Sequence, residues 1–72
     1  MRVFFKMGCY GTLEPDRFFT FSEHDTGELA ERAAKREIDR GKTSDTMHII
    51  KCYENSNGVD EPTGEVWVIT KR

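Results

Sequence analysis

Only one stretch of this 72-residue chain has the apolar spacing of an amphipathic helix. It opens with Asp25-Thr26-Gly27-Glu28, which has the form of a capping box: a short acceptor residue followed three positions later by Glu. Gly41 stands where a left-handed C-terminal cap belongs. These signals predict a helix over about residues 26–40, with a buried half made of Leu29, Ala30, Ala33, Ala34 and Ile38.

The segments on both sides of this helix are rich in Phe, Val, Ile and Tyr and alternate with the period of a β-strand. They predict strands over residues 2–10, 17–22, 46–53 and 66–70. Residues 54–65 contain Asn57-Gly58, Pro62 and four acids, which predicts a long loop available for contacts.

This order of elements predicts one α+β domain over residues 1–72, with a four-stranded, mainly antiparallel sheet and one helix on one face (ββαββ). One helix cannot cover both faces of such a sheet. Large apolar residues nevertheless occur at both strand parities, as in Phe4 beside Phe5 and Trp67 beside Val68. We therefore expect the open face to contact a protein partner or a second copy in a homodimer.

The charge of the chain argues against a protein that binds nucleic acid alone, and its hydropathy argues against a membrane protein. The chain has 11 basic and 13 acidic residues and a net charge of -2, whereas proteins that bind nucleic acid alone are usually basic. No apolar run reaches the roughly 18 residues of a membrane span, and the N-terminus is charged too early for a secretory signal. The expected location is cytoplasmic, without membrane contact.

The residues that commonly carry chemistry do not form a recognisable motif. Cys9, His24, His48 and Cys52 lack the paired spacing of a zinc site, and two cysteines in a cytoplasmic chain are expected to be free thiols. The chain has no nucleophile elbow and no glycine-rich phosphate loop. We therefore expect no enzymatic activity, no cofactor and no metal.

The charges are segregated along the chain. Arg32, Arg36 and Arg40 follow one another at helical spacing and form a basic ridge, whereas Asp60 and Glu61 lie among the acids of residues 54–65. Acidic segments can compete with nucleic acid for a basic protein surface. These five residues and the single tryptophan, Trp67, are the predicted partner-binding residues.

In size, element order and composition, the chain resembles small orphan proteins of phages and prophages, some of which are anti-CRISPR proteins. The stretches that carry the resemblance are Arg17-Phe18-Phe19-Thr20-Phe21, residues 25–34 and Gly64-Glu65-Val66-Trp67-Val68-Ile69. The resemblance implies a non-enzymatic inhibitor that occupies a surface of a host defence complex, such as a CRISPR-Cas effector. It assigns no functional residue.

A second interpretation comes from the aromatic residues. Phe19, Phe21 and Trp67, with Arg17, are the residue types that stack and hold bases on a sheet. The alternative function is therefore a single-stranded nucleic-acid binding module. It is the less favoured of the two because the chain is acidic and lacks a second helix and a glycine-rich strand motif.

Overall fold

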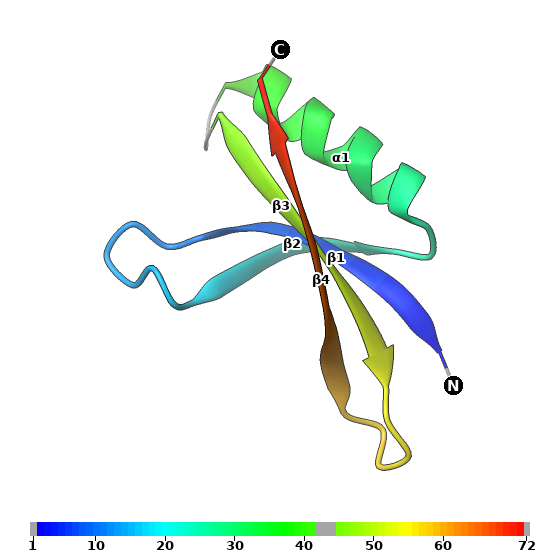
Figure 1. Cartoon of the computed structure of the whole chain (residues 1–72). Coiled ribbons are helices and arrows are strands. Elements are labelled where there is room, and N and C mark those ends of the chain that lie inside the picture. Colours follow the sequence, from blue (N-terminus) through cyan, green and yellow to red (C-terminus); the bar gives the residue numbers. More distant parts are fainter. Residues whose placement is uncertain (1, 42–44, 72) are drawn as a thin grey trace.

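The computed structural model describes residues 2–41 and 45–71, which form an antiparallel sheet with the strand order β2-β1-β3-β4 and one helix (Figure 1). Every neighbouring pair of strands is antiparallel. The predicted ββαββ order and α+β class are confirmed. The elements are β1 (Val3–Tyr10), β2 (Phe18–His24), α1 (Gly27–Arg40), β3 (Thr46–Glu54) and β4 (Asp60–Thr70).

The prediction of a long loop over residues 54–65 is wrong, because β4 begins at Asp60 and leaves only residues 55–59 between β3 and β4. The Asn55 side-chain oxygen closes this turn by accepting hydrogen bonds from the backbone N–H groups of Asn57 and Val59, at 2.8 and 3.0 Å. The two strands can therefore pair immediately beyond the turn, with Glu54 opposite Asp60.

Strand β4 tolerates the residues that suggested a loop because it is an edge strand. Pro62 cannot donate to a ladder, which an edge position permits. The register then shifts between Ile50 and Cys52, and Gly64 takes up the shift with φ +101, which favours glycine. Beyond this irregularity, Val66–Thr70 pair with β3 without interruption.

Both helix ends are capped, and one cap differs from the prediction. The Oγ1 atom of Thr26, not the side chain of Asp25, accepts the N–H of Leu29 at 3.2 Å. A threonine hydroxyl satisfies the same unpaired donors. At the other end, Gly41 adopts φ +68 and its N–H donates to the carbonyl of Ile38, as the sequence predicts.

The main core lies between α1 and the sheet. Three helix residues spaced by four positions are buried there, and the alanines among them let α1 lie close to β1 and β3. Leu29 was expected among them but is 44% exposed, because it is displaced by one residue, about 100° on the helix, from Ala30. The buried cluster comprises Met7, Ala30, Ala34, Ile38, Met47 and Ile49.

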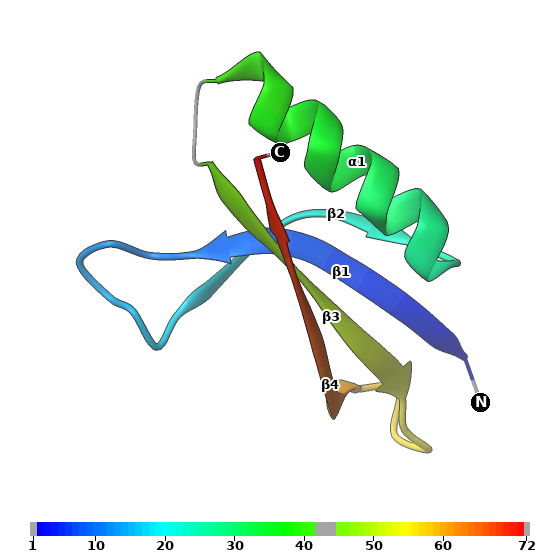
Figure 2. The same cartoon turned by 45° about the horizontal axis from the view of Figure 1, so that its top comes forward.

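Helix α1 crosses only one face of the twisted sheet, and the β1–β2 and β3–β4 hairpins extend beyond it (Figures 1 and 2). The opposite face, which we call the open face, has a buried residue of its own. Phe4 is fully buried, lies opposite Cys52 on β3, and has the Arg2 guanidinium 4.4 Å from its ring centroid. The sheet is therefore packed on both sides near the start of β1.

Strands β1 and β2 approach closely at Gly8. A Cβ atom there would lie 1.9 Å from the carbonyl oxygen of Phe19, so only glycine fits. The register shifts at the same place: Met7 lies opposite Ser22, and Gly8 opposite Thr20, which leaves Phe21 as the extra residue of a bulge.

The single described helix, at 14 residues, is too short and too polar to cross a membrane.

Candidate functional site

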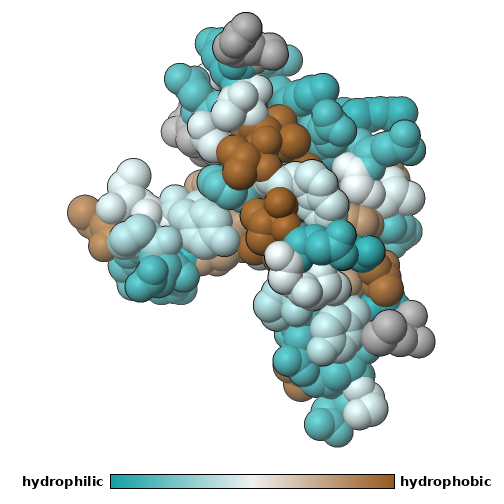
Figure 3. All heavy atoms as spheres, viewed as in Figure 1, coloured by the Kyte–Doolittle hydropathy of each residue, from teal (hydrophilic) through white to brown (hydrophobic). Residues whose placement is uncertain are grey.

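A groove of about 420 Å³ lies between the N-terminal half of α1 and the C-terminal half of β4. Its floor is made by Phe5, Ile49, Trp67 and Ile69, which come from three strands. In Figure 3, apolar residues gather over the C-terminal half of β4, with hydrophilic residues on both sides. We call this feature the Trp67 groove.

Trp67 is held in place on one side and exposed on the other. It lies opposite Ile49 of β3, and its ring centroid is 5.9 Å from that of Phe5 at an interplanar angle of 53°. It remains 43% exposed. A large aromatic ring that is braced but accessible loses little conformational entropy when another molecule covers it.

The walls of the groove are predominantly acidic. Glu28 and Glu31 project from α1, Glu65 from β4 and Lys51 from β3. Lys51 pairs with Glu65 at 3.4 Å, and Lys35, which lies outside the lining, pairs with Glu31 at 3.1 Å.

Glu28 has no ion-pair partner within the described parts of the chain. Of the three carboxylates in the lining, two are therefore paired with lysines, and that of Glu28 is left unpaired in a groove that also holds the exposed Trp67 ring. That combination attracts a cation, which gains both from the negative potential and from the face of Trp67.

The predicted arginine ridge exists but lies outside this groove. Arg32, Arg36 and Arg40 are exposed on α1 and line a separate shallow hollow with Lys35 and Asp39. Arg40 also forms an ion pair with Glu37 of the same helix at 3.0 Å, which partly neutralises its charge.

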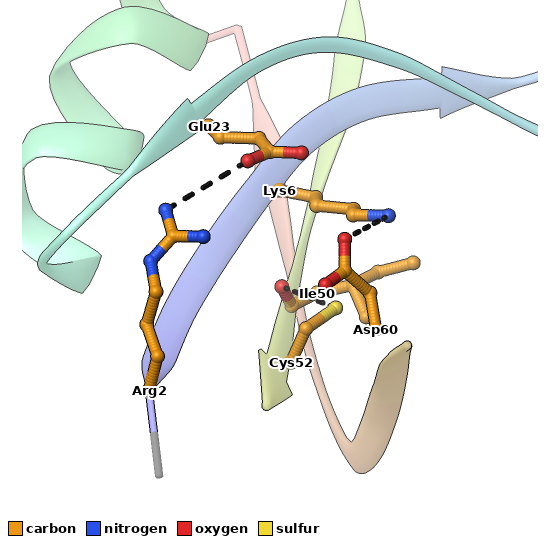
Figure 4. Close-up of polar contacts among 6 residues, drawn as sticks. All are labelled: Arg2, Lys6, Glu23, Ile50, Cys52 and Asp60. Carbon is orange, nitrogen blue, oxygen red and sulfur yellow. Dashed lines mark hydrogen bonds and ion pairs between the residues drawn. The ribbon is translucent and has the colours of Figure 1, made fainter. Parts of the chain in front are cut away.

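The predicted acids lie at the far end of the β3–β4 hairpin. Asp60 pairs with Lys6 across the open face at 3.7 Å (Figure 4). Glu61 accepts a hydrogen bond of 2.6 Å from the Asn55 side chain. Both acids therefore help to hold the hairpin. The six predicted residues occupy three separate places: the outer side of α1, the hairpin end and, for Trp67 alone, the groove.

The aromatic residues of the nucleic-acid interpretation are not brought together. Phe19 and Phe21 belong to β2, whereas Trp67 belongs to β4, at the opposite edge of the sheet. The Arg17 guanidinium lies 5.0 Å from the centroid of the Phe19 ring. These side chains therefore do not form one continuous stacking platform.

The two cysteines are free and lie on different faces. Cys9 packs against the core beneath α1, whereas Cys52 is buried on the open face. Burial raises the pKa of the Cys52 thiol, Lys6 opposes this, and the carboxylates of Asp60 and Glu23 add to it. Figure 4 shows Cys52 near Lys6 and Asp60. A reactive thiolate is therefore disfavoured at Cys52.

The ring of His48 packs edge-on against Tyr10 at 4.9 Å. Its Nδ1 atom is buried without a hydrogen-bond partner among the described residues. No group of three or more His, Cys, Asp or Glu side chains within residues 2–41 and 45–71 could hold a metal ion.

Sequence reasoning missed most of the groove. Its signals were local: Glu65 and Trp67 are two apart on one strand and so share a face, and Glu28 and Glu31 are three apart on one helix. Placing these two pairs opposite each other requires the strand order, in which β4 pairs with β3 rather than with β2.

Comparisons of the chain with protein-family models, with curated proteins and with solved structures found no match.

Proposed function

We propose that this protein is a small non-enzymatic inhibitor that binds a protein partner through the Trp67 groove. The observation that carries the proposal is the exposure of a braced tryptophan among three carboxylates. Aromatic residues at the centre of a patch contribute most of the binding free energy in many protein interfaces. An apolar floor with charged walls also matches the usual plan of an interface.

The charge of the groove indicates the kind of segment it binds. An Arg or Lys side chain of the partner would lie over Trp67, with its positive group near Glu28 and Glu65. Arginine suits this site better than lysine because its planar group stacks on a ring and also pairs with carboxylates.

A site that binds a basic segment of its partner can inhibit that partner by competing with nucleic acid. RNA-guided effectors hold their nucleic acid in a positively charged channel, and a protein that covers such a channel with carboxylates competes with the nucleic acid. This action agrees with the resemblance to anti-CRISPR proteins. The proposed partner is therefore a host complex, such as a CRISPR-Cas effector, blocked at its nucleic-acid channel.

Fluorescence of Trp67 tests the groove directly, because it is the only tryptophan in the chain. We expect an oligo-arginine peptide to change its emission saturably, and an oligo-thymidylate of similar length to leave it unchanged. The reverse result, with binding by the oligonucleotide that weakens steeply with salt, would favour the single-stranded nucleic-acid module instead.

A pull-down from nuclease-treated bacterial lysate, followed by mass spectrometry, tests the partner. Trp67→Ala removes the centre of the groove. Phe21→Ala is the matched control, because Phe21 is similarly exposed but lies on the opposite edge strand. We expect the wild type and Phe21→Ala to retain one stoichiometric protein and Trp67→Ala to lose it. Equal retention by all three would contradict a role for the groove.

A further inference from the structure

The outer edge of β4 is the least protected feature of the sheet. Ten of its eleven residues are exposed, and β4 is the last strand, so alternate N–H and C=O groups of Val66–Thr70 point away from β3. Within Val66–Thr70 there is no proline, charge or bulge. Natural edge strands usually carry at least one of these, because a bare edge pairs with other strands.

The other edge of the sheet is protected in the usual ways. Strand β2 is interrupted by the bulge at Phe21 and carries Glu23, and a bulge twists an edge away from a further partner. Helix α1 packs chiefly on β3 and β1, so it does not cover the outer side of β4. The two edges therefore differ: beyond Pro62 and the register shift, the last five residues of β4 offer a regular stretch for pairing.

The regular part of this edge has a negative charge at one end and a positive charge at the other, so two antiparallel copies would bring opposite charges together. Glu65 precedes Val66, and Lys71 follows Thr70. If two copies of β4 pair antiparallel about a two-fold axis at Val68, Glu65 of each copy lies opposite Lys71 of the other. The same register places Trp67 opposite Ile69 and Val66 opposite Thr70, so each side chain meets one on its own face of the sheet.

The Lys71 ammonium group and the Glu65 carboxylate can each form a further ion pair. The ammonium group of Lys71 forms no ion pair with a described residue, although its backbone N–H extends the ladder by donating to Asp45 at 3.0 Å. The Glu65 side chain is 56% exposed and holds Lys51 at 3.4 Å, and a carboxylate can accept from two cations.

We propose that the protein forms a homodimer through antiparallel pairing of β4 with β4 of a second copy, in the register that places Val68 on the two-fold axis. The result is a continuous eight-stranded sheet with both helices on the same face. The two Trp67 grooves then lie on either side of the axis, with Trp67 of one copy next to Ile69 of the other. A dimer thus presents two adjoining binding grooves.

Sedimentation equilibrium across about 1 µM to 1 mM measures this association. We expect the mass to rise from 8.3 kDa toward about 16.6 kDa, twice the monomer mass. Val68→Lys places two ammonium groups together at the axis and should raise the dissociation constant at least about tenfold. Val59→Lys is the matched control, because Val59 is similarly exposed but lies in the hairpin turn, and this variant should dimerise like the wild type.

A charge exchange tests the register. Lys71→Glu places two carboxylates opposite each other and should weaken the dimer about tenfold, whereas adding Glu65→Lys should restore most of the association. Far-ultraviolet circular dichroism verifies that each variant is folded.

A wild-type chain that stays monomeric throughout the range would overturn the proposal and leave the edge to a strand from another protein. Dimerisation unaffected by Val68→Lys would overturn it as well. If the charge exchange fails to restore association, the Val68 register is wrong.

Discussion

Cys52 is the residue whose environment most changes its chemistry. It is buried on the open face, and burial raises the pKa of its thiol from the ordinary value of 9.0. The unfolded chain therefore loses the thiol proton at a lower pH than the folded chain. The contribution of the Cys52 thiol to folding stability is therefore fully present at pH values below the pKa of the unfolded chain. It is lost as the pH rises through the pKa of the folded chain.

Replacement of Cys52 by valine should remove this dependence, because valine has a similar size and does not ionise. We expect the wild type to lose more free energy of unfolding than Cys52→Val between pH 7 and pH 10, as measured by urea denaturation. The two proteins share every other ionisable group, so only the difference between the two curves reports on Cys52. Parallel curves over this range would contradict the assignment.

At the scale of single elements, the start of α1 distinguishes two adjacent residues. The Oγ1 atom of Thr26 accepts the Leu29 N–H at 3.2 Å, whereas the sequence pattern pointed to Asp25. Thr26→Ala should therefore lower the free energy of unfolding by about 1 kcal/mol.

Thr26→Ser keeps the acceptor and should stay close to the wild type, and Asp25→Ala should cost much less than Thr26→Ala. Thermal denaturation of the three variants measures the order. A larger loss for Asp25→Ala would show that the helix is capped one residue earlier.

The elements also show how far sequence reasoning extends. Alternation predicted three of the strands to within about two residues at each end, because these segments are rich in apolar and aromatic residues that recur with the period of a strand. It failed for residues 60–65, where Pro62 and Gly64 are loop residues by composition. They are compatible with a strand only because β4 is at the edge and its register shifts there.

The candidate site was harder to predict than the fold, for a physical reason. Trp67 could be selected as a large aromatic on a strand. Its neighbours Phe5 and Glu28 lie far from it in the sequence: Phe5 reaches it through the pairing of β1 with β3 and β3 with β4, and Glu28 through the packing of α1 on the sheet. Gly8 is similar: its need for glycine comes from the carbonyl of Phe19 on another strand. Contacts between strands carry no local signal.

At the scale of the whole molecule, packing on two sides of the sheet stabilises a small domain. Phe4 is fully buried on the open face, away from the cluster beneath α1. Phe4→Ala should cost about 3–5 kcal/mol. A domain of 72 residues has a total stability of only about 4–11 kcal/mol, so this variant should be close to unfolding.

Phe21→Ala is the control for the loss of an aromatic ring, because Phe21 lies 40% exposed in the β2 bulge, and it should cost much less. Urea denaturation measures both. If Phe4→Ala lowers the free energy of unfolding by no more than Phe21→Ala does, packing on the open face contributes little, and the cluster beneath α1 stabilises the sheet alone.

The position of β1 has a consequence for biosynthesis. Strand β1 is translated before the other described elements, yet it lies in the interior of the sheet, between β2 and β3. It can form a hairpin with β2 early, but Phe4 and Met7 stay uncovered until β3, with which β1 pairs, has been translated as far as Cys52. The nascent chain therefore carries an uncovered apolar segment until β3 has been made, and the rate of translation sets the time in which that segment can aggregate.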